Sequence, residues 1–261
     1  MIRSVCDDSA FIEAVASFST DDPFTCRLIS LCRSYPPTLR FVGYWLITDE
    51  AGKTNGAIAR NGSSFLLYLT DHSDCAEVSD FLHMAGAAEV LCDGKYTLEN
   101  FAHVSEGILM KTTRPVPADR EDRSFFAPDL RAVHALLLQC ADDDFSPPAF
   151  EDFYVDVNHK QRHGTVRLCG VNSGDQLAAA AMTVAECDGC AVLGAVACRP
   201  DFRRQGFGTA VVSQLTNQLI AEGKTVFLHR ANGKNAAFYS HLGFTSCGTW
   251  REYRVTNQTN R

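Results

Sequence analysis

The stretch that most constrains the fold leads from a buried strand through a glycine-containing turn into a helix. Residues 191–198 are apolar on both faces, which is typical of a short strand in the middle of a sheet. Pro200 cannot continue such a strand, so the chain must turn there. After the turn, Val211, Leu215 and Leu219 recur every fourth residue and predict one buried helix face.

The turn itself has the composition of an anion-binding loop. It contains Arg203, Arg204, Gln205, Gly206, Phe207 and Gly208. The first N–H groups of a helix have no internal partner and carry the positive end of the helix dipole. Glycines without a Cβ allow an anion to approach these donors, and arginines add charge-assisted hydrogen bonds. A phosphate or pyrophosphate is therefore the expected occupant, although this motif alone is equally consistent with a plain turn that starts a helix.

A second motif follows downstream. Asn232 comes just after a strand-like run at residues 225–229, Tyr239 follows seven residues later, and Gly243 and Phe244 come next. Together with Arg-x-x-Gly-x-Gly after a strand, this order and spacing resemble the GNAT superfamily of acyl-CoA-dependent N-acyltransferases. The resemblance covers roughly residues 125–255.

The resemblance implies a set of cofactor-binding residues. The backbone amides of residues 204–209 would hold the pyrophosphate of acetyl-CoA, and the strand end at 196–198 would pair with the pantetheine arm as an added strand does. A backbone amide near Val196 would stabilise the oxyanion. Asn232 matches the family asparagine that contacts the cofactor, and Asn235 either shares that role or caps the helix. The candidates are Val196, Ala197, Cys198, Arg203, Arg204, Gln205, Gly206, Phe207, Gly208, Thr209, Asn232 and Asn235.

Tyr239 matches the family tyrosine that often protonates the leaving thiolate. A phenol has a pKa of about 10 and a thiol one of about 8.5, so complete transfer is uphill, but partial donation still assists. The alternative is a buried aromatic ring that packs with Phe238 and Leu242.

The general base is not identified, because the strand at 190–198 carries no carboxylate. The candidates are Glu186, His229 and Glu252. Each is also readily explained as an ordinary surface or core residue, and the resemblance leaves ordered water as the alternative.

The same order of elements occurs twice along the chain. The first half predicts helices within 7–35, where Pro23 could open a second helix at Asp22. It then predicts strands at 41–48, 56–60 and 63–70, the last two joined by a tight hairpin at Asn61 and Gly62. A helix at 74–85, a strand at 88–92, a helix at 98–103 and a strand at 107–112 follow. The second half predicts a helix from Pro128, a loop near 145–163, strands at 165–171, 176–185 and 190–198, a helix at 206–221, a strand at 224–230, a helix at 235–242 and a strand near 248–255.

We therefore expect an α/β (α+β) protein built as tandem GNAT-like folds, each a mixed, mostly antiparallel central sheet flanked by helices. The expected domains are a degenerate GNAT-like domain at 1–113, a linker at 114–124 and a catalytic GNAT domain at 125–261. The first half is called degenerate because residues 69–75 contain no arginine or glycine at the equivalent turn, and Asp71 and Asp74 would repel a pyrophosphate.

Composition narrows the class of partner. The net charge of −7 argues against nucleic acid, and no apolar run is long enough to span a membrane. The eleven scattered cysteines predict free thiols in the cytoplasm. Cys187 and Cys190 form one C-x-x-C pair, which could be half a zinc site, but no second pair stands at suitable spacing and no metal is expected.

These observations lead to a functional hypothesis. The chain is expected to move an acetyl group from acetyl-CoA to a primary amine of a small molecule or peptide, by direct transfer in a ternary complex, acting as a monomer or homodimer. One alternative is a non-catalytic acyl-CoA-binding sensor or scaffold. Another is a nucleotide-binding module, which the antiparallel strands before the loop disfavour, because a dinucleotide fold places a parallel βαβ unit there.

Overall fold

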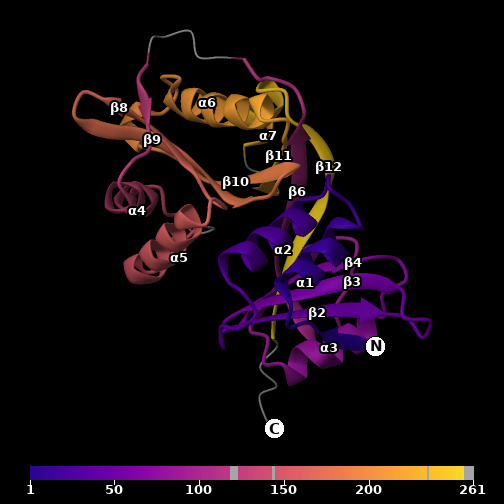
Figure 1. Ribbon diagram of the computed structural model, residues 1–261. Coiled ribbons are helices and arrows are strands. Elements are labelled where there is room, and N and C mark those ends of the chain that lie inside the picture. The colour runs from indigo at the N-terminus through magenta and orange to yellow at the C-terminus, as the bar shows by residue number, and fades with distance from the viewer. Residues whose placement is uncertain (118–122, 143–144, 234, 256–261) are drawn as a thin grey trace. The chain divides into compact units, whose positions relative to one another are not determined.

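The computed structural model describes residues 1–117, 123–142, 145–233 and 235–255, and the chain divides into two compact units (Figure 1). Unit 1 contains residues 1–110, 229–234 and 246–261, and unit 2 contains residues 111–228 and 235–245. Part of the predicted linker, residues 118–122, lies outside the described residues.

Unit 1 is a mixed sheet with helices on its faces. Its elements are β1 (Ile2–Ser4), α1 (Asp8–Ala16), α2 (Pro23–Ser34), β2 (Val42–Thr48), β3 (Thr54–Asn61), β4 (Ser64–Leu69), α3 (Cys75–Met84), β5 (Glu89–Asp93), β6 (Phe101–Thr112) and β12 (Thr245–Val255). The strand order is β1-β2-β3-β4-β5-β12-β6. The pairs β1–β2, β2–β3, β3–β4 and β5–β12 are antiparallel, whereas β4 and β5 run parallel.

Local sequence explains how this unit begins. The carboxylates of Asp7 and Asp22 accept hydrogen bonds from the first-turn amides of α1 and α2, and Pro23 occupies the first turn of α2, as predicted. The predicted tight hairpin also forms, because Asn61 pairs with Ser64. Its turn needs Gly62, which has a φ of +62°.

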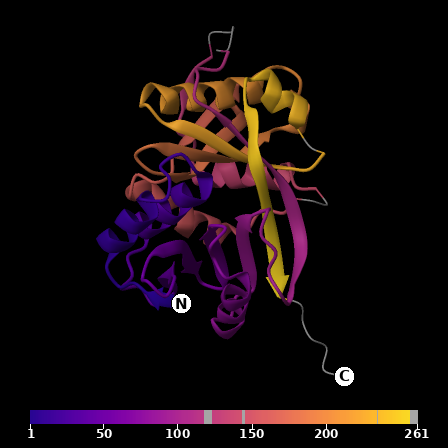
Figure 2. The same cartoon turned by 90° about the vertical axis from the view of Figure 1, so that its right-hand side faces the viewer.

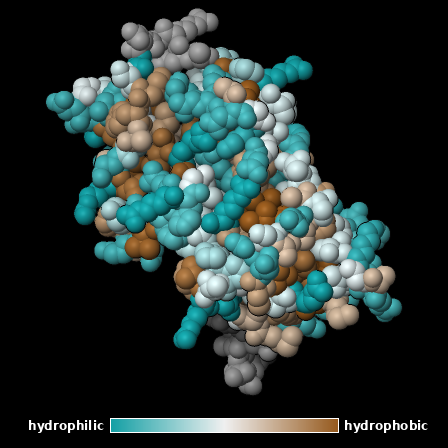
Figure 3. All heavy atoms as spheres, in the orientation of Figure 1, coloured by the Kyte–Doolittle hydropathy of each residue, from teal (hydrophilic) through white to brown (hydrophobic). Residues whose placement is uncertain are grey.

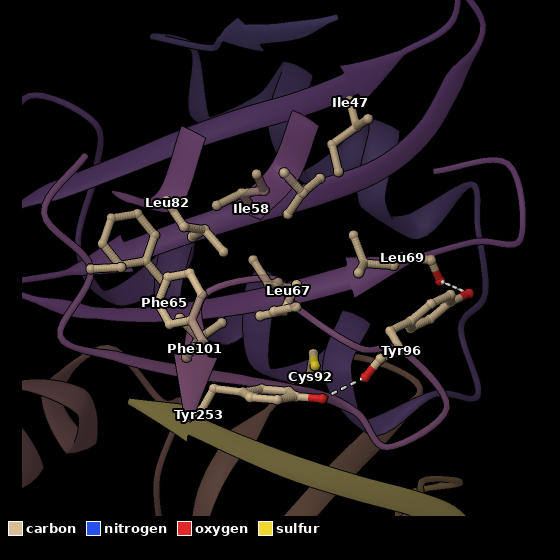
Figure 4. Close-up of a cluster of buried hydrophobic side chains, with 14 residues drawn as sticks. Ile47, Ile58, Phe65, Leu67, Leu69, Leu82, Cys92, Tyr96, Phe101 and Tyr253 are labelled. Carbon is tan, nitrogen blue, oxygen red and sulfur yellow. Dashed lines mark hydrogen bonds between the residues drawn. The ribbon is translucent and has the colours of Figure 1, made fainter. Parts of the chain in front are cut away.

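One core cluster of unit 1 lies between the sheet and α3 (Figure 4). The parallel pairing of β4 with β5 stops at Leu66 and Leu91, so the two strands part beyond that point. The Tyr96 hydroxyl donates a hydrogen bond of 2.9 Å to the carbonyl oxygen of Leu69, the last residue of β4. The Tyr253 hydroxyl in turn donates to the Tyr96 carbonyl at 2.8 Å. The Tyr96 side chain therefore occupies the position at which β4 separates from β5, and it satisfies the last carbonyl of β4.

Tyr96→Phe tests this hydrogen bond. The substitution leaves the buried Leu69 carbonyl without its donor, so we expect a loss of about 1–2 kcal/mol in the free energy of unfolding. Urea unfolding measures the change, with Tyr154→Phe as the control for loss of a hydroxyl group, because Tyr154 is exposed. Equal stability of the two variants would show that the bond contributes nothing.

Unit 2 repeats the arrangement. Its elements are β7 (Phe125–Phe126), α4 (Leu130–Gln139), α5 (Phe150–Arg162), β8 (Leu168–Ser173), β9 (Gln176–Glu186), β10 (Cys190–Cys198), a 3-10 turn (Pro200–Phe202), α6 (Phe207–Ala221), β11 (Thr225–Ala231) and α7 (Ala236–His241). The strand order is β7-β8-β9-β10-β11, antiparallel except for the parallel pair β10–β11. Helix α6 packs against β8, β9 and β10, while α4 packs against β9 and β10 on the other face and carries α5 (Figure 1). The predicted fold class is thus confirmed in both units.

Two predicted elements were wrong. Residues 98–103 do not form a helix, because Leu98 and Phe101 enter the core of unit 1 and β6 already begins at Phe101. Figure 2 shows β6 (magenta) as a long strand beside β12 (yellow). The expected loop near 145–163 is mostly helix α5, which buries Phe153 and Val157 on one side.

The last strand belongs to unit 1. Residues from Trp250 to Arg254 in β12 pair with residues from Asp93 to Glu89 in β5, in antiparallel register. The predicted boundaries at 113 and 125 follow the repeat in the sequence, whereas the contacts place residues from 246 onward with the first half. The sheet of unit 1 is thereby completed by a segment that the chain reaches last.

Candidate functional site

The end of β10 has one edge that no strand covers. Parallel pairs with β11 run from Cys190 with Thr225 to Leu193 with Leu228 and then stop, although β10 continues to Cys198 beside β9. Within the described part of the chain, β10 has only β9 and β11 as sheet neighbours. The backbone between residues 194 and 198 therefore offers hydrogen-bonding groups to an extended ligand on the side of β11.

A bulge bends β10 at this point. Gly194 pairs with Met182 and Ala197 with Ala180, so one extra residue is inserted in β10. Ala195 has a φ of +45°, a conformation that is unusual for a residue with a Cβ. Bulges re-aim backbone groups, and strained backbone persists where the surroundings impose it, often at functional sites.

The three predicted strand residues differ in their surroundings. Ala197 is buried in the core cluster with α4, whereas Val196 and Cys198 are half-buried. The Cys198 carbonyl oxygen accepts hydrogen bonds from Arg203 Nε and from the Cys140 thiol, both at 3.3 Å. Burial raises the pKa of the Cys198 thiol, so this cysteine is not an activated nucleophile.

The turn after β10 presents an uncapped helix N-terminus. Gly206 is the N-cap of α6 with a φ of +85°, Arg204 has a φ of +62°, and residues 203–206 are exposed. No side chain among the described residues caps α6. Four other helices have such a cap, supplied by Asp7, Asp22, Asp74 and Asp129. The predicted residues Phe207, Gly208 and Thr209 form the first turn of α6, where backbone amides have no partner within the helix, although the Gly208 amide contacts the Cys198 thiol.

Sequence reasoning missed Arg123. One of its guanidinium nitrogens, Nη2, donates to the Gln205 carbonyl oxygen at 2.9 Å, and the guanidinium lies over the ring of Phe207 at 4.4 Å. A Cβ built on Gly206 would stand 3.2 Å from the other nitrogen, Nη1. Arg123 belongs to the predicted linker, where six of the ten residues from 114 to 123 are charged without a visible pattern. A third arginine thus joins Arg203 and Arg204 at the turn.

The remaining predicted residues fall into different units. Tyr239 in α7 and Asn235, the N-cap residue of α7, belong to unit 2 with the loop, whereas Asn232 belongs to unit 1. Asn235 makes no side-chain capping bond, so the capping alternative is not seen in the structure. The Asn232 side-chain amide donates to Glu106 at 3.4 Å.

Tyr239 keeps its proton. Its ring packs edge-on against Phe238 and Phe244, as the packing alternative requires, and burial raises its pKa to about 12. Among the described residues, no hydrogen-bond partner is recorded for its hydroxyl. A neutral phenol with an uncommitted O–H can donate to a ligand atom.

One candidate for the general base is held in a structural network. Glu186 is 2% exposed and accepts hydrogen bonds from Arg167, Thr183 and Lys224 at 2.7–2.9 Å. Because Glu186 is buried and bound by three side chains, its carboxylate is not presented to a substrate. His229 and Glu252, the other two candidates, lie in unit 1.

The first half fills the equivalent positions with its own side chains. Asp74 accepts hydrogen bonds from the amides of Ala76 and Glu77 at the start of α3, where the second half has its open amides. Asp71 pairs with Lys95 at 3.1 Å. Tyr96 lies at the strand end, where its hydroxyl donates to the Leu69 carbonyl.

The Cys187 and Cys190 sulfur atoms lie 3.4 Å apart at the β9–β10 hairpin, and both residues are buried.

Hydrophilic residues are spread between smaller hydrophobic areas on the face shown in Figure 3. Among the described residues, no helix is both long enough and apolar enough to cross a membrane.

Comparisons with known proteins agree with this geometry. Residues 168–255 match the family model described as FR47-like protein. The structure is similar to a tandem GNAT protein from the clavulanic acid biosynthesis pathway, with a TM-score of 0.61, 14% identity and coverage of 97% of each chain. It is also similar to a GCN5-related N-acetyltransferase from Sphaerobacter thermophilus, with a TM-score of 0.63, 13% identity and coverage of 97% of this chain and 94% of the other. None of the curated proteins compared with the chain matches it.

Proposed function

We propose that this chain, which has the fold of tandem GNAT proteins, is an N-acetyltransferase that uses acetyl-CoA. In this proposal the acetyl group moves directly to a primary amine of a small molecule or peptide in a ternary complex. The observation that carries the proposal is the combination in unit 2 of an uncovered β10 edge and an uncapped α6 beside it.

These two features suit the two ends of one ligand. The pantetheine arm has amide groups that would pair with the backbone of Val196, Ala197 and Cys198, as an added strand does. The pyrophosphate would lie on the α6 amides of residues 207–209, beside Arg203, Arg204 and Gly206. Gln205 is held by its own contact, from its side chain to the Asp201 carbonyl at 2.9 Å, which fixes the loop.

The transfer needs few further groups. A backbone amide near Val196 would stabilise the oxyanion, and the protonated Tyr239 would donate to the departing thiolate. Ordered water would remove the proton from the amine, because Glu186 is held by Arg167, Thr183 and Lys224. Asn232 and Asn235 remain proposed cofactor contacts from the family resemblance.

The two halves of the repeat would have different functions. Residues 125–261 would carry catalysis, and residues 1–113 would not bind acetyl-CoA, because Asp74 and Tyr96 occupy the equivalent positions. We also propose a cytoplasmic location, consistent with eleven free cysteines, and a monomer or homodimer as the active form.

Calorimetric titration with acetyl-CoA tests the proposal, followed by assay of thiol release with a panel of primary amines. We expect micromolar binding and amine-dependent release of the CoA thiol. Absence of binding would reject the acetyltransferase, whereas binding without turnover on any amine would favour the sensor or scaffold alternative.

Arg123→Gln tests the residue that the sequence did not reveal. A charge-assisted hydrogen bond to the pyrophosphate would be lost, so we expect the Kd for acetyl-CoA to rise about 10-fold. Arg131→Gln is the matched control. The Arg131 guanidinium also stacks on a phenylalanine ring, that of Phe150, but Arg131 lies on α4 and not at the loop before α6. Tighter binding by Arg123→Gln would instead show that Arg123 obstructs the loop.

A further inference from the structure

Unit 1 contains a buried pair of nitrogen donors without acceptors. Arg27 lies on α2 and His229 on β11, and Arg27 Nε and His229 Nε2 are buried atoms with no hydrogen-bond partner. Among the described residues, Arg27 also makes no ion pair. Buried polar atoms are nearly always satisfied in folded proteins, so an unsatisfied pair needs a specific explanation.

The charge on Arg27 persists in this position. Burial lowers its pKa to about 10, which still leaves the guanidinium protonated near neutral pH. Burial and then the Arg27 charge hold the pKa of His229 well below its ordinary value, so the imidazole is neutral. The pair therefore has one net positive charge and no carboxylate to balance it.

The surroundings of His229 are aromatic and rigid. Its ring stacks on Trp250 at 5.9 Å and meets the edge of Phe24 at 5.7 Å. The Trp250 indole is itself fixed by a hydrogen bond of 3.2 Å from Nε1 to the Arg230 carbonyl. Phe24 and Trp250 are nearly fully buried with Leu109 in one apolar cluster. Such surroundings make an unpaired charge costly and any bound counter-charge strongly held.

We propose that Arg27 and His229 form a binding site for the carboxylate group of a small-molecule ligand. The guanidinium has the planar fork that matches the two oxygens of a carboxylate, and a neutral imidazole adds a third N–H donor. One carboxylate balances the single charge of Arg27. A phosphate dianion would leave excess negative charge among Phe24, Trp250 and Leu109, and it is therefore disfavoured. Arg27 and His229 are each partly exposed as whole residues, whereas Arg27 Nε and His229 Nε2 are buried, so a carboxylate would approach through the exposed part of the two side chains.

Thermal unfolding with sodium acetate and sodium propionate tests the site, with sodium chloride holding the ionic strength constant. We expect both carboxylates to stabilise the wild-type protein saturably, by about 3–5 °C at ten times the Kd. Arg27→Met should lose this response while melting at the same or a higher temperature without carboxylate, because the unpaired charge is gone. Loss of stability in Arg27→Met together with an unchanged acetate response would overturn the proposal.

Further variants separate this site from other anion sites. His229→Phe keeps an aromatic ring but removes the donor, so we expect its carboxylate response to weaken as well. Arg3→Met removes an exposed charge from β1 and should behave as the wild type. Gly206→Asp, which blocks the proposed pyrophosphate loop, should keep the carboxylate response, so the test does not depend on acetyl-CoA binding. Stabilisation by inorganic phosphate equal to that by acetate would overturn the assignment to carboxylates.

Discussion

Replacing Gly206 with aspartate is expected to abolish acetyl-CoA binding. Gly206 is the N-cap of α6, and an aspartate there would place a carboxylate beside the amides proposed to hold the pyrophosphate. It would both compete for these donors and repel the phosphates. We expect the Kd for acetyl-CoA to rise at least about 100-fold, which corresponds to about 2.7 kcal/mol. Calorimetric titration measures the loss directly.

A matched substitution separates this effect from backbone strain. Gly206 and Gly223 stand before and after the same helix, with φ values of +85° and +80°. Aspartate is therefore strained to a similar degree at both positions, at about 1–3 kcal/mol. Gly223→Asp should lower stability similarly and leave acetyl-CoA binding intact. Equal loss of binding in both variants would indicate that strain, not the added charge, is responsible.

Tyr239→Phe is expected to lower kcat for acetyl transfer about 100-fold, with a much smaller change in the Kd for acetyl-CoA. The substitution removes the proposed proton donor but keeps the ring that packs against Phe238 and Phe244. Steady-state assay of thiol release gives kcat, and titration gives the Kd. A kcat within twofold of the wild type would assign Tyr239 to packing alone.

The pH dependence offers a separate check on Tyr239. Its active form as an acid is the protonated one, which is present below the pKa and lost as the pH rises through it. Because burial raises that pKa to about 12, Tyr239 stays protonated throughout the range in which the protein can be assayed. The kcat of the wild type should therefore show no alkaline decline from this group below a pH of about 10. A decline below that pH that disappears in Tyr239→Phe would show that Tyr239 titrates in this range, and would contradict the raised pKa and not the role as acid.

The sequence predicts best where the cause is local. The turn at Pro200, the capping of α2 by Asp22 and the hairpin at Asn61 and Gly62 each depend on a few neighbouring residues, and each is found in the structure. The placement of residues 196–209 on a strand end, a turn and a helix start follows from the same kind of local pattern.

The errors come from signals that were overlooked or are not local. Helix α5 had a visible signal, since Phe150, Phe153 and Val157 recur at helical spacing between an acidic first turn and a basic last turn. No comparable signal exists for Arg123, because its contact with Gln205 spans 82 residues. The pairing of β12 with β5 is also non-local, and tertiary pairing of this kind overrides local preference.

The position of β12 has a consequence for biosynthesis. Unit 1 begins at residue 1, yet its sheet includes β12, in which residues from Trp250 to Arg254 pair with β5. On the ribosome, about 150 residues of later sequence must be made before β5 can meet this partner, and during that time its edge is an unpaired strand open to other chains. A stop codon placed before Trp250 would therefore damage the N-terminal unit, far from it in sequence, and would expose nascent chains to aggregation.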